Sequence, residues 1–380
     1  MVQPPGFVAR FDREANFDGT FEFASGATGA RLASDRGPDN GKCNFHVGST
    51  TSAIYRINDN NGEDFKFQKV QNGLSWITPE ADEISRQTYL RDNPAALRYR
   101  TVACDPTPVQ DVPVKVRSLG VRMVTDVMTV ALAVPPPAQI DLTPTRAEGK
   151  AAWNSLAYLL RRAAAFRLDV SPAELEAGFQ FVSDGAVGIR PTGRVFLADV
   201  LENGAGYARH LSAPDEFLSL LRYITDDSNP RSFAAGLYSS AHASCRTSCY
   251  QCLREYGNMR IHALLDWRLG LDMAELLLDA DAPIGLYGRR WSPLITPGFL
   301  ESYFRGINLQ PQLEDDLPVG TRDGLMGRRY CLILTHPLWS ETPQHYNNEL
   351  ATISQNYAAQ GYEVRTRSIF RVMRFPWEAA

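Results

Sequence analysis

The middle of the chain reads His242-Ala-Ser-Cys245-Arg-Thr-Ser-Cys249-Tyr-Gln-Cys252-Leu-Arg-Glu-Tyr256-Gly-Asn258-Met-Arg-Ile-His262-Ala-Leu-Leu-Asp266-Trp267. Three of the six cysteines of the chain lie here within eight residues. The Cys249-x-x-Cys252 spacing lets two thiolates reach one ion, and Cys245 precedes this pair. Structural zinc sites take four nitrogen or sulfur ligands in a tetrahedron. The sequence therefore predicts a Zn²⁺ site with these three cysteines and a fourth ligand.

His262 is the preferred fourth ligand. Apolar residues recur at helical spacing over Met259–Leu278, so an amphipathic helix is expected there. His262 falls in the first turn of that predicted helix, close enough to the cysteines to complete the tetrahedron. Asp266 lies four residues later on the same face, where its carboxylate can accept the other imidazole N–H and orient the ring. A solvated or ion-paired helix residue is the competing interpretation of Asp266.

Other ligand sets stay open. His242 is the main alternative for the fourth position, and the distant Cys43 or Cys104 is a further one. A catalytic zinc with an open position is less favoured, because no glutamate stands in a His-x-Glu arrangement of the deaminase kind. Three independent thiols, or a redox pair, would also give this pattern.

Composition narrows the class of protein. The chain has 380 residues, 44% of them hydrophobic, and a net charge of −4, which excludes a globally basic nucleic-acid-binding protein but not a local basic patch. No apolar run is long enough for a membrane-spanning helix, and residues 1–10 lack the apolar core of a secretory signal. The sparse, clustered cysteines are typical of a reduced, cytoplasmic chain and not of a disulfide scaffold.

The sequence positions of the five lysines exclude a phosphate-binding ATPase loop of the common kind. A phosphate-binding ATPase loop needs Gly-Lys followed by Ser or Thr. The only Gly-Lys pairs are Gly41-Lys42 and Gly149-Lys150, and neither is followed by a hydroxyl residue. The chain therefore has no such ATPase site of its own. The many arginines suit phosphate recognition, although a GC-rich genome would explain them equally well.

Hydrophobic patterning predicts a mixed α/β, or α+β, fold in three segments. Residues 1–144 are β-rich, 145–282 form a helical zinc-binding segment, and 283–380 comprise an irregular connector followed by a βαβ segment. The first segment includes an expected hairpin between residues 53–57 and 65–70.

Individual elements follow from the same patterns. Residues 121–134 predict a buried strand, and Thr145-Arg-Ala-Glu148 predicts a capping box at the start of a helix. The βαβ segment comprises a strand at 330–335, a helix at 347–359 and a strand at 362–374.

Two regions are candidates for contact with nucleic acid. Asn203, Gly204 and Gly206 form a glycine turn after a strand, and such turns can present backbone N–H groups to phosphate. A purely structural turn is the competing interpretation, and catalysis by Asp199 or Glu202 is a weaker one.

The second region is the end of the chain, where arginines alternate with aromatic residues. Single-strand binding uses this combination, with charge for the phosphates and rings for the bases. An ordinary half-exposed strand is the alternative. The residues concerned are Arg365, Arg367, Arg371, Arg374, Tyr362, Phe370, Phe375 and Trp377.

Taken together, these motifs resemble a known family. Leu197-Ala-Asp199-x2-Glu202-Asn203-Gly204-Ala-Gly206-Tyr207, the Cys245-x3-Cys249-Tyr-x-Cys252-Leu-Arg run and His262-x-Leu-Leu-Asp266-Trp are similar to the MrfA-type zinc-binding domain of DEAD/DEAH-box (superfamily 2) helicases. The similarity covers roughly residues 145–280, with weaker matches at Pro5-Gly6-Phe7 and Arg371-x-x-Arg374-x-Pro376. Many members have four cysteines, and here His262 stands where a later ligand would fall.

The resemblance implies a structural zinc, a helicase core as partner and a role on DNA. Such modules also occur in phage-defence systems of the DISARM and Druantia kind. We therefore expect a non-catalytic module of a superfamily 2 helicase system, whose motor lies in a separate chain or an upstream region. The alternatives are a metal-dependent nuclease or other nucleic-acid processing subunit, and a protein-interaction scaffold without DNA contact.

Overall fold

The computed structural model describes residues 43–58, 65–70, 73–76, 114–116, 119–182, 191–201, 203–295, 297–324 and 328–375. Its contacts divide the chain into two units, one of residues 1–32 and 51–125 and the other of residues 33–50 and 126–380. Pro5, Gly6, Phe7, Cys104, Glu202 and Trp377 lie outside the described residues. The division into three segments predicted from sequence stays a prediction.

The first unit contains a small antiparallel sheet. Its strand order is β3 (Gly73–Trp76), β2 (Phe65–Val70), β4 (Val114–Val116). The predicted hairpin between residues 53–57 and 65–70 is wrong, because β1 (Phe45–Asn58) pairs in a different sheet. Two strands with a polar connection resemble a hairpin in sequence. In the structure, each of the two pairs instead with strands that come later in the chain.

The main sheet of the second unit has the order β1-β5-β7-β6. The predicted buried strand is β5 (Leu119–Leu132), which pairs antiparallel with β7 (Thr192–Asp199). β7 in turn pairs antiparallel with β6 (Leu175–Val182). This sheet carries Asp199 to its end, directly before the glycine turn.

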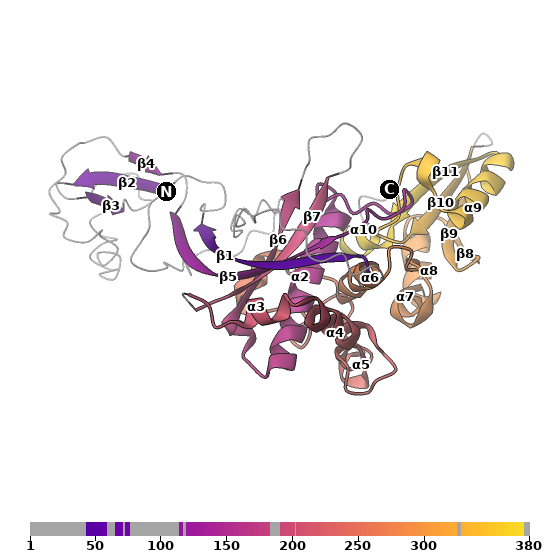
Figure 1. Cartoon of the computed structure of the whole chain (residues 1–380). Helices are drawn as coiled ribbons and strands as arrows, with labels where there is room; N and C mark the ends of the chain where they lie inside the picture. Colours follow the sequence, from indigo (N-terminus) through magenta and orange to yellow (C-terminus); the bar gives the residue numbers. More distant parts are fainter. Residues whose placement is uncertain are drawn as a thin grey trace. The chain divides into compact units, whose positions relative to one another are not determined.

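The long helix α2 (Ala147–Leu168) packs on β6 and β7 and on α6 (Trp267–Leu278) (Figure 1). Trp153 is fully buried on it and donates its indole N–H to the Leu142 carbonyl at 2.9 Å. The sheet comes so close that a Cβ at Gly193 would lie 2.4 Å from the Trp153 ring. Burying each large apolar side chain of this helix contributes about 1.5–3 kcal/mol.

Shorter helices lead from the sheet to the cysteines. The predicted single helix over Met259–Leu278 is wrong, because the chain forms a 3₁₀ turn over Tyr256–Ile261 and starts α6 only at Trp267. Asp266 caps α6 and so determines where it begins. The remaining elements here are α3 (Tyr207–Leu211), α4 (Pro214–Thr225), α5 (Phe233–Leu237) and a 3₁₀ turn at Ser240–His242.

The C-terminal part contains the predicted βαβ segment. β10 (Arg329–Thr335) and β11 (Tyr362–Ser368) are parallel and are joined by α9 (Asn348–Ala359). The sheet continues antiparallel through β9 (Leu317–Asp323) and β8 (Gln310–Glu314), in the order β11-β10-β9-β8 (Figure 1). The chain does not stay extended to residue 374, since Ser368 caps a short helix.

The expectation of an irregular connector after residue 283 is wrong. This region contains α7 (Gly288–Ile295), α8 (Pro297–Gly306) and the β8–β9 hairpin. Several of its glycines and prolines lie within helices and strands, such as Pro293 in α7 and Gly320 in β9. The short helix that follows β11 is α10 (Ile369–Arg374).

One hydrophobic core runs through the second unit. It includes residues from every part of it, from Phe45 through Cys245 and Cys252 to Phe370. A smaller cluster surrounds Phe304. The β-rich beginning, helical middle and C-terminal sheet with its helix confirm the predicted α+β class. Within the described residues no helix is long and apolar enough to cross a membrane.

Candidate metal centre

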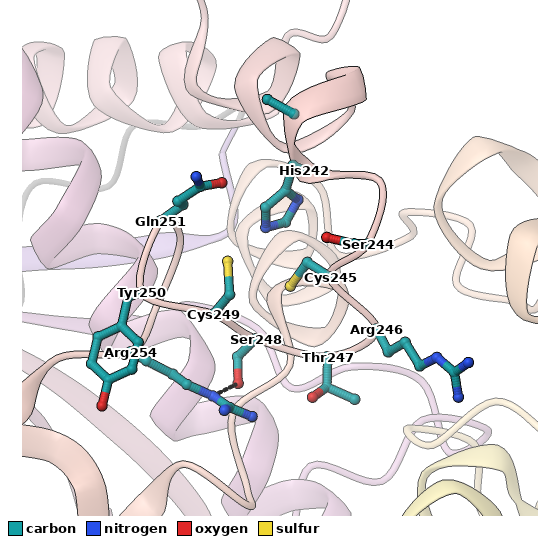
Figure 2. A pocket seen from close by; sticks show the side chains of 11 residues that line it. His242, Ser244, Cys245, Arg246, Thr247, Ser248, Cys249, Tyr250, Gln251 and Arg254 are labelled. Carbon is teal, nitrogen blue, oxygen red and sulfur yellow. Dashed lines mark hydrogen bonds between the residues drawn. The ribbon is translucent and has the colours of Figure 1, made fainter.

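Four side chains meet in the loop region before α6. One ligand atom from each of His242, Cys245, Cys249 and Cys252 lies within 4.8 Å of the others. We call residues 242–254, which carry them, the cysteine hook. Figure 2 shows His242, Cys245 and Cys249 turned toward a common point. A cluster of this composition can bind a metal ion.

Backbone hydrogen bonds give the hook its shape. The N–H of Cys245 donates to the His242 carbonyl at 2.9 Å, and the N–H of Cys252 donates to the Cys249 carbonyl at 3.1 Å. Two tight turns thus bring four ligands together from a short stretch of chain. The Trp267 N–H donates to the Thr247 carbonyl at 2.9 Å, so the hook is fastened to the first residue of α6.

The sulfur spacing is that of metal ligands. Cys252 Sγ lies 3.7 Å from Cys249 Sγ and 3.9 Å from Cys245 Sγ. A tetrahedral ion with Zn–S bonds of about 2.3 Å separates its sulfurs by about 3.8 Å. A disulfide would instead need a separation of about 2.05 Å. All three cysteines are free, and these two separations are close to the edge length of a zinc tetrahedron.

His242 is buried and has one ring nitrogen to spare. Nδ1 donates to the Leu237 carbonyl at 2.8 Å, while Nε2 is buried and has no hydrogen-bond partner among the described residues. The ring packs edge-on against Trp267, with centroids 5.6 Å apart. A metal-binding histidine typically has this arrangement, in which a carbonyl fixes the tautomer and leaves the other nitrogen's lone pair for the ion.

The electrostatics of the hook favour a thiolate. The hydrogen bond from Cys245, together with His242 and the Cys249 N–H, lowers the pKa of Cys252 to about 4, although burial opposes this effect. The same contact with Cys252, together with burial, raises the pKa of Cys245. Cys252 raises the pKa of His242. A thiolate is the metal-binding form of cysteine, and the lowered pKa of Cys252 favours that form.

His262, the predicted fourth ligand, lies elsewhere. Its Nε2 donates to Asn258 Oδ1 at 2.8 Å and to the Glu255 carbonyl at 3.0 Å, and its ring packs edge-on against Tyr250. Burial lowers the pKa of His262, which favours this neutral form. The structure thus brings His242, and not His262, to the three sulfurs. The reason is that His262 follows a 3₁₀ turn and does not lie in a helix that faces the hook.

Asp266 does not orient a ligand histidine as predicted. Its carboxylate accepts from the Arg268 N–H at 3.1 Å and forms ion pairs of 3.6 Å with Arg268 and with Arg374. Burial raises the pKa of Asp266, and the two arginines oppose that effect. Its role is therefore to start α6 and to hold Arg374.

The more distant cysteines do not join the cluster. Cys43 is half-buried at the start of the described chain, and Cys331 is buried in β10. Burial raises the pKa of the Cys331 thiol to about 12, so it behaves as a small apolar residue.

The glycine turn directs its N–H groups inward. The Asp199 carboxylate accepts from the backbone N–H groups of Ala205 and Gly206, both at 2.7 Å, and of Ala208 at 2.9 Å. The Gly204 N–H donates to the Leu201 carbonyl. These donors already have partners, so the geometry gives no support to a phosphate site at Asn203, Gly204 and Gly206.

Positive φ angles explain the composition of this turn. Asn203, Gly204 and Gly206 have φ values of 68°, 77° and 86°. Asparagine and glycine tolerate this left-handed region better than other residues. The turn matches the structural interpretation that the sequence left open.

The C-terminal arginines do not form one surface. Arg365 is exposed and pairs with Glu363 at 2.8 Å, whereas Arg371 pairs with the buried Glu148 at 2.7 Å. Arg374 is buried against Asp266 and donates to the Ala263 carbonyl. Phe370, one of the predicted stacking rings, is only 1% exposed. The predicted arginine–aromatic surface is therefore dispersed, and two of its arginines hold α10 in place.

A sequence signal for His242 did exist. His242-x-x-Cys245 has the same spacing as Cys249-x-x-Cys252, so the hook consists of two equivalent turns with two ligands each. The repeated spacing is easily overlooked in the sequence, because the first of the four residues is a histidine and the other three are cysteines.

Comparisons with known proteins give little further information. No family model matches the chain, and no curated protein matches it. Among solved structures, a crystal structure of the DUF1998 helicase MrfA bound to DNA is similar over 66% of this chain, with a TM-score of 0.32 and 11% identity. The chain spans 24% of the length of that helicase. A TM-score this low does not show a common fold, and no family is assigned on it.

Proposed function

We propose that this chain is a non-catalytic zinc-binding module of a superfamily 2 helicase system that acts on DNA. The ligands are Cys245, Cys249, Cys252 and His242. The observation that carries the proposal is the pair of sulfur separations of 3.7 and 3.9 Å next to a buried imidazole nitrogen without a partner. This donor set is that of a closed structural zinc site.

Zinc at this position would tie the hook into a single rigid turn. The Thr247 carbonyl accepts from the Trp267 N–H, so a rigid hook would also fix the start of α6. Helix α6 in turn packs on α2. Bound zinc contributes its binding free energy to folding, because the unfolded chain does not preserve the site.

The link to a helicase rests on the sequence motifs. The Asp199–Tyr207 and Cys245–Asp266 runs resemble the MrfA-type zinc-binding domain, and the chain carries no ATPase loop of its own. The motor would therefore be a separate chain or an upstream region. A cytoplasmic location and a part in anti-phage defence belong to the same proposal.

A nuclease finds less support in the structure. Within the described ranges, the metal-binding group that the side chains form consists of one histidine and three cysteines, with no carboxylate. Nucleases that use two metal ions rely instead on hard oxygen ligands.

The decisive experiment is metal analysis of the purified protein. We expect one zinc per chain, retained on dialysis against a weak chelator, and no hydrolysis of ATP by the chain alone. A protein that is free of metal yet folds cooperatively would overturn the zinc assignment. Helicase association is tested separately, by co-purification of a superfamily 2 ATPase with the tagged chain from its own host.

A further inference from the structure

The cysteine hook borders an open pocket that is much larger than an ion. The pocket has a volume of about 500 Å³, and its lining includes Arg246, Thr247, Ser248, Tyr250 and Arg254. In Figure 2 the side chains of Arg246 and Arg254 leave the hook on the side away from His242. The metal ligands thus occupy one part of the pocket, and a second part remains for another group.

The charge of this second part is positive. Arg246 and Arg254 have no carboxylate partner among the described residues, and no aspartate or glutamate lines the pocket. Other arginines of this region do have such partners, such as Arg161 with Glu255. Two unpaired guanidinium groups in one pocket attract a multiply charged anion, since each can donate two hydrogen bonds to a phosphate.

The geometry of Arg254 is fixed in advance. Its Nε donates to Ser248 Oγ at 2.9 Å, and Ser248 is 7% exposed. Within the part of the chain that the structure describes, the remaining guanidinium N–H groups of Arg254 are left for a ligand. The Thr247 hydroxyl lies in the same lining and offers a further donor. Binding to an arginine held in this way costs less side-chain entropy than binding to a mobile one.

An aromatic ring stands beside the two arginines. Tyr250 lines the pocket and is 60% exposed. The ring lies nearly perpendicular to the ring of His262, with centroids 5.6 Å apart and an interplanar angle of 86°, and most of it remains exposed. This contact gives His262 a role although it lies apart from the three sulfurs, namely to support the Tyr250 ring.

We propose that the hook pocket binds single-stranded nucleic acid, with Arg246 and Arg254 on the phosphates and a base stacked on Tyr250. Charge for the backbone and an exposed ring for the base is the combination that such sites use. This inference rests on the proposed function and names the surface that would contact DNA. The hook pocket thus takes the place of the C-terminal arginines as the candidate DNA-binding surface, because those arginines do not form one surface in the structure.

A competing explanation concerns the metal itself. Three thiolates around Zn²⁺ carry a net charge of about −1, and the arginines would neutralise it. In that case their removal would weaken zinc binding and leave nucleic-acid affinity unchanged. The two explanations therefore predict opposite results in one pair of measurements.

The test uses the full chain loaded with zinc and a fluorescein-labelled single-stranded oligonucleotide. Anisotropy titrations between about 50 and 200 mM salt compare the wild type with the double variant Arg246→Ala/Arg254→Ala. We expect binding to weaken roughly tenfold and the slope of log affinity against log salt to fall by about 1.4, or about 0.7 for each lost phosphate contact. Tyr250→Ala should weaken binding by about fivefold or more, while Tyr250→Phe should retain it.

Two controls separate the possible failures. The variant Arg222→Ala/Arg231→Ala removes the same charge from exposed positions outside the pocket and should bind like the wild type. Zinc content is measured on every variant. Full zinc content with an unchanged affinity and salt slope in the Arg246/Arg254 variant would overturn the pocket assignment while leaving the zinc module intact. Loss of zinc with unchanged affinity would show that the arginines serve the metal.

Discussion

The imidazole of His242 uses its two nitrogens for different tasks. Nδ1 is bound to the Leu237 carbonyl, which leaves Nε2 as the buried atom without a partner. His262 uses its Nε2 as a donor to Asn258 and Glu255 and faces Tyr250. Two histidines on either side of the cysteines are therefore suited to different roles, ligand and support.

This difference can be tested by a pair of variants. We expect His242→Ala to lose its zinc to a competing chelator at least tenfold more readily than the wild type, because a tetrahedral site loses one of four ligands. His262→Ala should keep the wild-type zinc affinity and lose only local stability. The measurement is zinc release followed by a colorimetric chelator. Equal zinc loss in both variants would contradict the assignment of His242.

A second residue-scale prediction concerns Asp199. Its carboxylate is fully buried and accepts three backbone N–H groups of the glycine turn. Asp199→Asn places an N–H₂ group against those donors and should lower the free energy of unfolding by about 2–4 kcal/mol. Urea unfolding measures this change. Asp215→Asn, the same change at an exposed position in the first turn of α4, should have little effect, and a similar loss there would refute the explanation.

At the residue scale, the sequence predicted which cysteines would cluster better than it predicted which histidine would join them. The spacing of Cys245, Cys249 and Cys252 was sufficient to predict convergence on an ion. The choice between His242 and His262 was not predictable in the same way, because it depends on where a 3₁₀ turn ends and α6 begins. Asp266 determines that start through a cap and two ion pairs, one of them with Arg374 more than a hundred residues away.

Among the elements, α10 shows how distant parts of the second unit are joined. Ser368 Oγ and Arg371 Nε each contact Glu148 Oε1 at 2.7 Å, and Glu148 lies in the first turn of α2, fully buried. The predicted capping box of Thr145 and Glu148 is therefore wrong. Helix α2 begins after Arg146 without a side-chain cap, because the Glu148 carboxylate is bound by residues from the other end of the chain.

This arrangement predicts a dependence of stability on pH. Burial raises the pKa of Glu148, but the hydrogen bonds from Arg371 and Ser368 outweigh it and leave the pKa below the ordinary value of 4.5. A lowered folded-state pKa stabilises the protein above the unfolded-state value and ceases to do so as the pH falls through the folded-state value. Glu148→Gln should therefore cost about 2 kcal/mol at neutral pH, and the difference from wild type should shrink below pH 4.5.

Urea unfolding of both proteins across this pH range measures the effect, and the difference between them cancels other acid-sensitive groups, including the metal ligands. Glu363→Gln is the matched control, because its ion pair with Arg365 is exposed on both sides. It should show no measurable change at any pH. A wild-type-minus-variant difference that stays constant to low pH would contradict the role of Glu148.

Sequence patterns succeeded for elements that are stabilised locally. β10, α9 and β11 have clear apolar periodicity, and Asn347 caps α9 with its own side chain. Patterns failed where tertiary contacts decide, as in α7, where Trp291 donates to the buried Asp272 and Arg290 pairs with Asp272 and Glu275 of α6. A stretch rich in glycine and proline became helical because α6 supplied those partners.

On the scale of the molecule, two of the four proposed metal ligands belong to the main core. Cys245 and Cys252 lie in the same hydrophobic cluster as the centres of α2, α6 and the C-terminal sheet. We therefore expect removal of zinc by a strong chelator to lower the melting temperature of the second unit as a whole, in a single transition. Circular dichroism and calorimetry measure it, and restoring zinc should restore the transition. A melting curve unaffected by chelation would contradict the structural role of the ion.

The contacts of α10 also determine how far the polypeptide can be shortened. Glu148 and Asp266 are carboxylates in the interior of the second unit, and α10 supplies one arginine partner to each of them, Arg371 to Glu148 and Arg374 to Asp266. A truncation before residue 371 would remove one of the two arginine partners of each interior carboxylate and leave only Arg146 beside Glu148 and Arg268 beside Asp266, which destabilises the fold because a buried charge depends on its partners. Any minimal version of the zinc-binding segment must therefore retain this distant C-terminal helix, even though the segment's own motifs end a hundred residues earlier.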